Sequence, residues 1–277
     1  MNDPEEIDLM IDRAHSARMY DYYLGGKTNY AADRAVADEA MKLFPAARIS
    51  TRANRAFMHR AVHHLAADHG IRQFLDIGTG IPTTPNLHEI AQSVTPDARV
   101  VYVDNDPIVL AHARALLVGD PRGTTEYIAA DLRDPDSITG SSELRAVLDL
   151  SRPVALTMIA IVHFVEDDVA YAAVRQLVDL LPSGSFLALS ASTADFDPEA
   201  GAGVTERYRS GGVPLHLRSH AGVATFFTGL ELLEPGVTQV HKWRPEQGGF
   251  GIGFGSRSVP DRDVPTYGAV ARKNQER

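Results

Sequence analysis

The sequence predicts a doubly wound α/β fold, in which helices cover both faces of a mostly parallel sheet. Two patterns support this prediction. The candidate strands are apolar on both faces rather than alternating, as strands buried inside a parallel sheet must be. Between residues 72 and 190 these apolar runs alternate with amphipathic segments, which is the order of repeated strand–helix units.

The first two strand–helix units carry the clearest signals. Arg72–Ile77 is a strand candidate that ends in the turn Gly78–Gly80. Arg99–Val103 is a second strand, and Pro107 after it suits the first turn of a helix with Asp106 as its N-cap. Between the two strands, apolar residues recur at the spacing of one helix face. They are Leu87, Ile90, Ala91 and Val94.

Three further strands are expected at Glu126–Ala130, Pro153–Ala160 and Ser185–Ser190, with a helix before the last of them. The apolar residues that mark this helix are Val174, Leu177, Val178 and Leu181. A helical stretch near 198–228, a strand near 231–240 and a last strand at Thr266–Ala271 follow. The glycine-rich segment 248–255 is expected to be a loop, because no helix follows it.

The N-terminal part precedes the sheet. Residues 1–70 are expected to form a helical segment, notably Ala31–Leu43 and Thr51–Asp68, and residues 71–277 the sheet domain. A chain of 277 residues with 44% hydrophobic residues suits one globular domain with an appended segment.

Composition narrows the function classes. The chain has no cysteine, which excludes disulfides, thiolate metal sites and cysteine nucleophiles. Its net charge of −9 argues against a nucleic-acid partner. No apolar run approaches the ~20 residues that cross a bilayer, and the acidic start lacks the apolar region of a signal peptide. We therefore expect a cytoplasmic protein without membrane contact, and no His/Asp/Glu cluster indicates a metal site. The oligomeric state is left open.

Three carboxylates stand at successive strand ends: Asp76, Asp104 and Asp131. In an open parallel sheet, ligands bind at the carboxyl ends of the strands, near the point where the strand order reverses. Each aspartate alone could be a turn former or an N-cap. Three aspartates at the ends of successive strands indicate a nucleoside site, in which Asp104 accepts hydrogen bonds from the ribose hydroxyls.

The first turn distinguishes two nucleoside cofactors. A dinucleotide site uses G-x-G-x-x-G, whose helix N-terminus holds a pyrophosphate. Here Gly78 and Gly80 are present, but Thr83 occupies the third position. Asp76, two residues before the first glycine, would repel a pyrophosphate and attract the ammonium and sulfonium of S-adenosylmethionine. The charge pattern favours S-adenosylmethionine over NAD, and an NAD-dependent oxidoreductase is the less favoured alternative.

With these residues in place, the chain resembles the class I methyltransferases, and more narrowly a family of S-adenosylmethionine-dependent methyltransferases found mostly in actinomycetes. The resemblance rests on Ser16–Tyr30, Asn54–Phe57, Gln73–Gly80, Val103–Pro107, Val162–Phe164 and Trp243–Glu246. It implies a Rossmann-like, mostly parallel seven-stranded sheet, with Asp131 and Leu132 flanking the adenine. Two residues depart from the patterns of relatives: Pro82 stands where many class I enzymes have glycine, and Ala191 where a histidine is expected.

Charge pattern and resemblance together give an expected set of cofactor-binding residues. They are Tyr20, Tyr23, Gly26, Asn29, Arg55, Asp76, Gly78, Thr79, Gly80, Asp104, Asn105, Asp131, Leu132, Ala160 and Ile161. The first four belong to an aromatic and glycine-rich segment that either caps a helix or folds over the strand ends as a lid, with tyrosine faces near the sulfonium. Arg55 either holds the cofactor carboxylate or is solvated.

His163 is the candidate catalytic residue. It follows the fourth strand, where a general base with a pKa close to neutral would be near the transferred methyl group. The alternative is a histidine bonded to backbone at a strand end. The sequence thus predicts a methyltransferase for a small-molecule acceptor, whose pocket would be formed by Pro198–Phe227 and the glycine-rich segment. The alternative is a non-catalytic S-adenosylmethionine-binding sensor or partner-binding protein.

Overall fold

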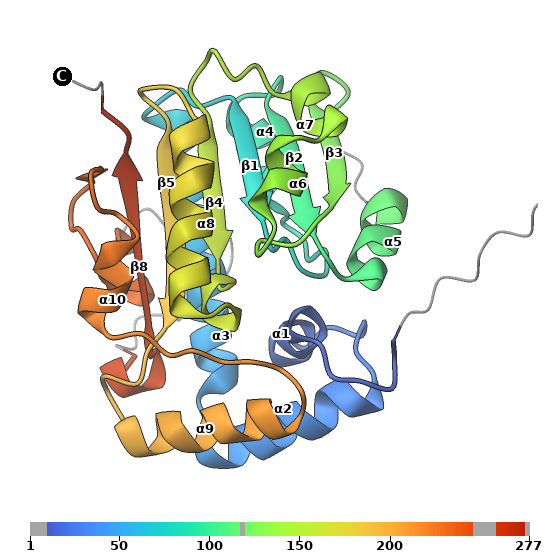
Figure 1. Cartoon of the computed structure of the whole chain (residues 1–277), viewed down its shortest axis with the longest axis vertical. Helices are drawn as coiled ribbons and strands as arrows, with labels where there is room; N and C mark the ends of the chain where they lie inside the picture. Colours follow the sequence, from blue (N-terminus) through green and yellow to red (C-terminus); the bar gives the residue numbers. More distant parts are fainter. Residues whose placement is uncertain (1–9, 117–119, 246–258, 275–277) are drawn as a thin grey trace, which may run out of the picture.

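The structure is a computed structural model, and it describes residues 10–116, 120–245 and 259–274. Its centre is one sheet with the strand order β3-β2-β1-β4-β5-β8-β6, and β7 pairs with β8 (Figure 1). The strands are β1 Gln73–Ile77, β2 Arg99–Asp104, β3 Thr124–Ala129, β4 Ala155–Ile159, β5 Phe186–Ser192, β6 Glu231–Leu232, β7 Thr238–Gln239 and β8 Thr266–Arg272. The pairs among β1 to β5 are parallel, whereas β8 runs antiparallel to its three partners. The predicted doubly wound, mostly parallel sheet is confirmed.

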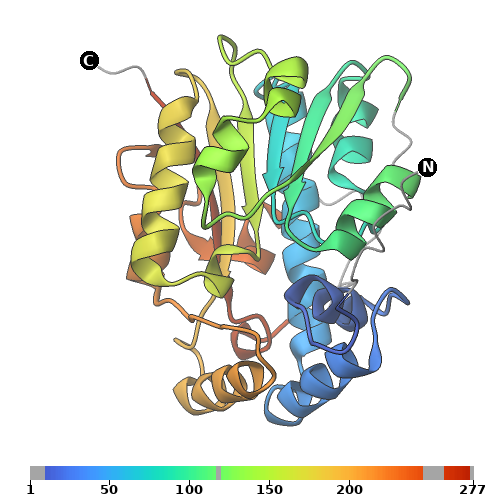
Figure 2. The ribbon, with the colours of Figure 1, turned by 45° about the vertical axis from the view of Figure 1, so that its right-hand side comes forward.

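Helices cover both faces of this sheet (Figures 1 and 2). The helices are α1 Ser16–Leu24, α2 Ala31–Leu43, α3 Ala47–Ala67, α4 Leu87–Val94, α5 Pro107–Leu116, α6 Pro135–Thr139, α7 Ser142–Val147, α8 Asp167–Leu180, α9 Pro198–Ser210 and α10 His220–Thr225, with 3₁₀ turns η1 Val162–Phe164, η2 Val240–Lys242 and η4 Asp261–Asp263. No helix among the described residues is long and apolar enough to span a membrane.

Burial on both faces explains the continuous hydrophobicity of the strands. Phe74 and Leu75 are neighbours in β1, so their side chains point to opposite sides of the sheet, and each is fully buried. Phe74 packs in the cluster that includes α3 and α4, whereas Leu75 packs in the cluster that includes α8. Each strand therefore contributes to two cores at once.

Most predicted elements match the structure, with shifted ends. Helix α2 has the predicted bounds, and α3 begins four residues before the predicted Thr51. The expected helical stretch near 198–228 consists of α9 and α10 joined by a non-helical connection. The glycine-rich segment 248–255 lies outside the described residues.

The single strand predicted near 231–240 is wrong. The chain instead forms two short strands, β6 and β7, separated by a turn. Pro235 cannot donate a hydrogen bond to a neighbouring strand, and Gly236 has a φ of 80°, in the left-handed region. These two residues stop the pairing in the middle of the apolar run.

The N-terminal helices lie beyond the carboxyl ends of the parallel strands. Helix α1 sits below the tips of β1 and β4 in Figure 1, and α2 runs alongside α9. Met19 of α1, Ala37 and Ala40 of α2, and Tyr208 of α9 share a small hydrophobic cluster. The N-terminal helices α1 and α2 therefore pack against α9, which follows the parallel strands in the chain. Together these helices cover the carboxyl edge of the sheet.

Candidate functional site

A cavity of about 340 Å³ lies at the carboxyl ends of β1, β2, β3 and β4. Strand order reverses between β1 and β4, so this is the switch point at which open α/β sheets bind ligands. The turn after β1 forms the floor, and α1 and the residues before it, Ala14 and His15, contribute a wall.

The turn after β1 depends on two glycines. Gly78 has a φ of 72° and Gly80 a φ of 69°, both in the left-handed region. A Cβ on Gly78 would lie 2.5 Å from Cγ1 of Ile161, so the close approach of the β4 end requires glycine there. A Cβ on Gly80 would meet no atom within 4 Å. The turn therefore leaves open space above Gly80 for a ligand.

Asp104, the last residue of β2, is held by backbone donors. The Gly80 N–H donates to its Oδ2 at 2.8 Å, and the Asp106 N–H donates to its Oδ1 at 2.9 Å. Burial raises its pKa, although the two N–H groups act in the opposite direction. The carboxylate is fixed in orientation and keeps acceptor capacity for the hydroxyl groups of a ligand.

Asp76 in β1 is a buried carboxylate without an ion pair among the described residues. Its Oδ1 accepts a hydrogen bond of 2.5 Å from the Thr157 hydroxyl of β4. Burial raises its pKa to about 6, against the lowering effects of the Thr157 hydroxyl and of the Arg55 charge. A carboxylate with this environment would gain from a cationic ligand group in the cavity.

Arg55 of α3 also lines this cavity. Its Nη2 donates to the carbonyl of Thr83 and, at 2.9 Å, to that of Pro85. Its Nε is buried and has no hydrogen-bond partner in the described part of the chain. Burial lowers the pKa of the guanidinium. Arg55 is therefore a positioned cation at the cavity, rather than a solvated surface residue.

At the β3 end, Asp131 forms a polar group with two neighbours. Asn105 donates to its Oδ2 at 2.8 Å, and Arg133 binds both carboxylate oxygens. The hydrogen bonds from Arg133 are the main reason that its pKa is lowered to about 2. Asp131 is thus ionised and paired, and it is only half-buried, whereas Asp76 and Asp104 are buried.

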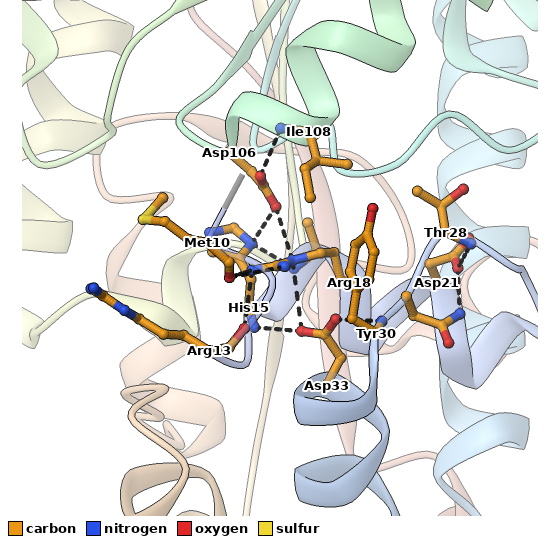
Figure 3. A network of polar contacts seen from close by, with 12 residues as sticks. Met10, Arg13, His15, Arg18, Asp21, Thr28, Tyr30, Asp33, Asp106 and Ile108 are labelled. Carbon is orange, nitrogen blue, oxygen red and sulfur yellow. Dashed lines mark hydrogen bonds and ion pairs between the residues drawn. The ribbon is translucent and has the colours of Figure 1, made fainter. Parts of the chain in front are cut away.

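Helix α1 is fixed over the strand ends by buried charges (Figure 3). Arg18 Nε lies 3.4 Å from Oδ2 of Asp106 and 3.6 Å from Oδ1 of Asp33. His15 Nδ1 lies 3.0 Å from the same Asp106 oxygen, and the His15 N–H donates to Asp33 at 2.8 Å. Asp106 also accepts from the Ile108 N–H at 2.9 Å, as an N-cap does. One carboxylate therefore starts α5 and anchors α1.

A chain of hydrogen bonds links α1 to the ends of β4 and β5. The Tyr20 hydroxyl accepts from Asn54 Nδ2 at 3.0 Å, and Asn54 Oδ1 accepts from the Ser190 hydroxyl at 2.6 Å. The hydroxyl oxygen of Ser190 in turn accepts a hydrogen bond of 3.0 Å from the Ala160 N–H. Ala160 has a φ of 59°, which is unusual for a residue with a side chain. These hydrogen bonds connect the Tyr20 hydroxyl, through Asn54 and Ser190, to the residue that follows β4.

The structure brings together all but three of the expected cofactor-binding residues. Those that line the cavity are Tyr20, Arg55, Asp76, Gly78, Thr79, Gly80, Asp104, Asn105, Asp131, Leu132, Ala160 and Ile161. Tyr23, Gly26 and Asn29 lie outside it. Asn29 instead donates to Asp21, which does line the cavity, at 2.8 Å. The roles of all fifteen residues in binding stay predictions.

His163 lies in η1, on a second cavity. Its Nδ1 accepts a hydrogen bond of 3.2 Å from the backbone N–H of Ser192. Burial lowers its pKa to about 3, with smaller effects of Arg218 and His216. This is far below the near-neutral pKa that the sequence suggested, because the ring is buried and no nearby carboxylate offsets the effect of burial. The backbone bond at a strand end matches the alternative interpretation, and catalysis by His163 stays a prediction.

Sequence analysis missed several residues that shape the site. Asp21 and His15 line the cavity, and Asn54 and Ser190 link its walls. The partners of Asn54 lie 34 and 136 residues away in the chain, so no local pattern could have revealed the contact.

The fold and the cavity define a nucleoside-binding protein of the class I methyltransferase type. The family model described as S-adenosyl methyltransferase matches residues 2–274, and the chain belongs to this family. S-adenosylmethionine is therefore its cofactor. Among proteins with curated functions, none matches the chain significantly.

Solved structures agree with this assignment. A DUF574 family protein from Streptomyces avermitilis is 54% identical, with a TM-score of 0.90, and the match covers 96% of this chain and all of that one. A candidate methyltransferase from Thermobifida fusca is 37% identical, with a TM-score of 0.85, over 96% and 97% of the two chains. The plantazolicin methyltransferase BpumL is similar in fold alone, with 13% identity and a TM-score of 0.51 over 94% and 95% of the chains.

Proposed function

We propose that this chain transfers a methyl group from S-adenosylmethionine to a small-molecule acceptor. The observation that carries the proposal is the pair of buried carboxylates, Asp76 and Asp104, on the floor of the cavity. Two negative groups at this position oppose a pyrophosphate and suit a cofactor with a cationic ammonium and sulfonium. The cavities of about 340 and 610 Å³ have the size of small-molecule sites.

The residues present fit the parts of this cofactor. Asp104 would accept hydrogen bonds from the ribose hydroxyls, because its two oxygens are already aimed by backbone N–H groups. Asp76 would pair with the ammonium, and Arg55, whose buried Nε has no partner among the described residues, would bind the carboxylate. Asp131 and Leu132 would border the adenine. Asn105, Ala160, Ile161 and the 78–80 turn would supply the remaining walls.

The bound cofactor would supply an electrophilic methyl group, which a lone pair of the acceptor displaces from sulfur. The chain would contribute orientation and exclusion of water. Helix α1 would act as the lid, and the ring of Tyr20 would face the sulfonium. A general base is needed only for an acceptor that must lose a proton before the transfer.

A second candidate function is a non-catalytic protein that binds S-adenosylmethionine as a sensor. The low pKa of His163 favours it, because the ring next to the cofactor cavity is a weak base. The two functions predict the same cofactor binding and differ only in whether the methyl group is transferred.

Two experiments test the proposal. Thermal shifts with S-adenosylmethionine, S-adenosylhomocysteine and NAD should show stabilisation by the first two only, because a ligand that binds the native state raises its melting temperature. Incubation with methyl-labelled S-adenosylmethionine and an actinomycete metabolite extract should then transfer label to a metabolite. Stabilisation by NAD alone would refute the cofactor assignment, and binding without any transfer would favour the sensor.

A further inference from the structure

A second cavity, of about 610 Å³, lies beside the cofactor cavity. It is bounded by the junction of α2 and α3, by α9, and by the segment that leads into β8. The segment after β4 separates the two cavities: Ala160 and Ile161 line the first, His163 lines the second, and Phe164 lines both. A molecule in the second cavity is therefore one aromatic side chain away from the cofactor site.

The lining of this second cavity is mostly apolar. Aliphatic and aromatic side chains come from α2, α3, α9 and the connection after α9; they include Phe44, Ile49, Val204, Leu215 and Leu217. Tyr23 and Tyr208 also line it, and their hydroxyls bond each other at 3.0 Å. One hydroxyl donates to the other, so the pair leaves a single O–H hydrogen for another acceptor.

The charged groups of the lining do not suit an anionic ligand. They are Asp197, Asp263 and Arg262. Arg262 Nε lies 3.9 Å from Oδ1 of Asp263, and the Arg262 side chain is 80% exposed, so the one cation of the described lining is largely hydrated and has a carboxylate beside it. An anion placed here would lose its hydration for a weak, solvent-screened attraction to this cation, which is costly. An uncharged molecule would not meet this cost.

His163 is a polar side chain of this lining whose ring tautomer is set by a hydrogen bond. Because the Ser192 N–H donates to Nδ1, that nitrogen must carry a lone pair rather than a hydrogen. The hydrogen of the neutral ring is then on Nε2. The ring can donate from Nε2 to a ligand, and this role requires no proton transfer.

We propose that the second cavity is the acceptor site, and that it takes an uncharged, largely apolar molecule with a hydrogen-bond-accepting atom bound by Nε2–H of His163. The identification of this molecule as the methyl acceptor rests on the proposed function. The chemistry of the ligand rests on the lining alone. His163 is then a positioning group rather than a base.

The probe for this site is 6-propionyl-2-(dimethylamino)naphthalene, an uncharged naphthyl ketone. Its emission moves to the blue in apolar surroundings and to the red when its carbonyl accepts a hydrogen bond. Titration is followed by exciting the probe directly, with S-adenosylhomocysteine at saturation. We expect one saturable site with blue-shifted emission. The naphthylsulfonate analogue 8-anilinonaphthalene-1-sulfonate should bind at least about tenfold more weakly, since it carries an unpaired charge.

Two variants of one helix locate the probe. Ala200 of α9 lines the second cavity, whereas Ala202 of the same helix is exposed. A200W fills the cavity and should weaken probe binding by about tenfold or more. A202W makes the same change on the solvent side and should leave probe binding unaltered. Equal binding by both variants, or no uptake by the wild-type protein, would overturn the proposal.

The role of His163 is tested by the emission of the bound probe. H163F removes the donor and should move the emission further to the blue, whereas H163Q, whose amide can accept from Ser192 and donate to the probe, should restore it. Unchanged emission in H163F would refute the hydrogen bond. Calorimetry with S-adenosylhomocysteine separates the proposed function from the assignment of the acceptor site. If the wild type does not bind S-adenosylhomocysteine, the proposed function is refuted. If the wild type binds S-adenosylhomocysteine but not the probe, only the acceptor site is refuted.

Discussion

Replacement of Asp76 by asparagine should stabilise the protein without its cofactor. Burial raises the pKa of Asp76 from 3.8 to about 6, so the folded state favours the protonated acid. Below pH 3.8 Asp76 is protonated in the folded and the unfolded state, so its ionisation does not affect the free energy of unfolding. Between pH 3.8 and 6 Asp76 ionises in the unfolded chain but stays protonated in the folded protein, so the free energy of unfolding falls with rising pH. Above pH 6 this loss of stability is complete. Two pKa units correspond to about 3 kcal/mol, which is the upper bound of the gain in D76N at pH 7.5.

Urea denaturation of the wild type and D76N at pH 7.5 and pH 4 measures this difference. Asparagine is neutral at both pH values and can still accept from the Thr157 hydroxyl. The gain should therefore be large at pH 7.5 and nearly absent at pH 4. A variant that is no more stable than the wild type at pH 7.5, or equally stabilised at both pH values, would refute the assignment of Asp76 as a destabilising buried carboxylate.

The same substitution should weaken cofactor binding. If ionised Asp76 pairs with the ammonium of S-adenosylhomocysteine, the affinity of the wild type should fall about tenfold from pH 7.5 to pH 5, because about one carboxyl in ten is ionised at one unit below its pKa. In D76N the affinity should be low and should not change over this range. Calorimetry at the two pH values measures both, and a wild-type Kd that is constant would contradict the pairing.

Three further substitutions test the N-terminal wall. In G26A the new Cβ would lie 1.9 Å from the Asp21 carboxylate, so we expect a loss of about 1–3 kcal/mol in urea denaturation; a neutral effect would show that this turn is not tightly packed. D106A removes one of the carboxylates near the buried Arg18, and a loss of about 3 kcal/mol is expected by the same measurement, whereas less than about 1 kcal/mol would show that α1 is held by other contacts. N54A breaks the hydrogen-bond chain below α1 and should cost about 1–3 kcal/mol and weaken S-adenosylhomocysteine binding in calorimetry; unaltered affinity would argue that the chain is structural only.

The sheet could be predicted because its signals are local. Continuous apolar runs followed by an aspartate or a glycine turn identify β1, β2 and the carboxyl edge where Asp76 and Asp104 meet. The interruption between β6 and β7 was also encoded locally, in Pro235 and Gly236, but the apolar residues around it masked the break. A helix or strand is visible in sequence where its own residues decide its conformation.

The walls of the site could be predicted only in part, because tertiary contacts decide which side chains face the cavity. Tyr20 and Tyr23 are three residues apart on α1, yet Tyr20 lines the cofactor cavity and Tyr23 the second one. Their separation on the helix leaves both close to the boundary between two sites, and the packing of α1 against α2 and α9 decides the outcome. No pattern within the segment contains that information.

The anchoring of α1 bears on how the cofactor cavity works. Asp106 is the N-cap of α5, directly after the strand that carries Asp104, and it also binds His15 and Arg18 of the N-terminal segment. Burial opposes ionisation of Asp106, but the hydrogen bond from His15 and the nearby charges lower its pKa, so the carboxylate stays ionised and keeps Arg18 paired. The wall over the strand ends is therefore attached to the same turn that presents Asp104. A cavity whose wall and floor share an anchor is already shaped before the cofactor arrives, and less ordering needs to be offset by the binding free energy.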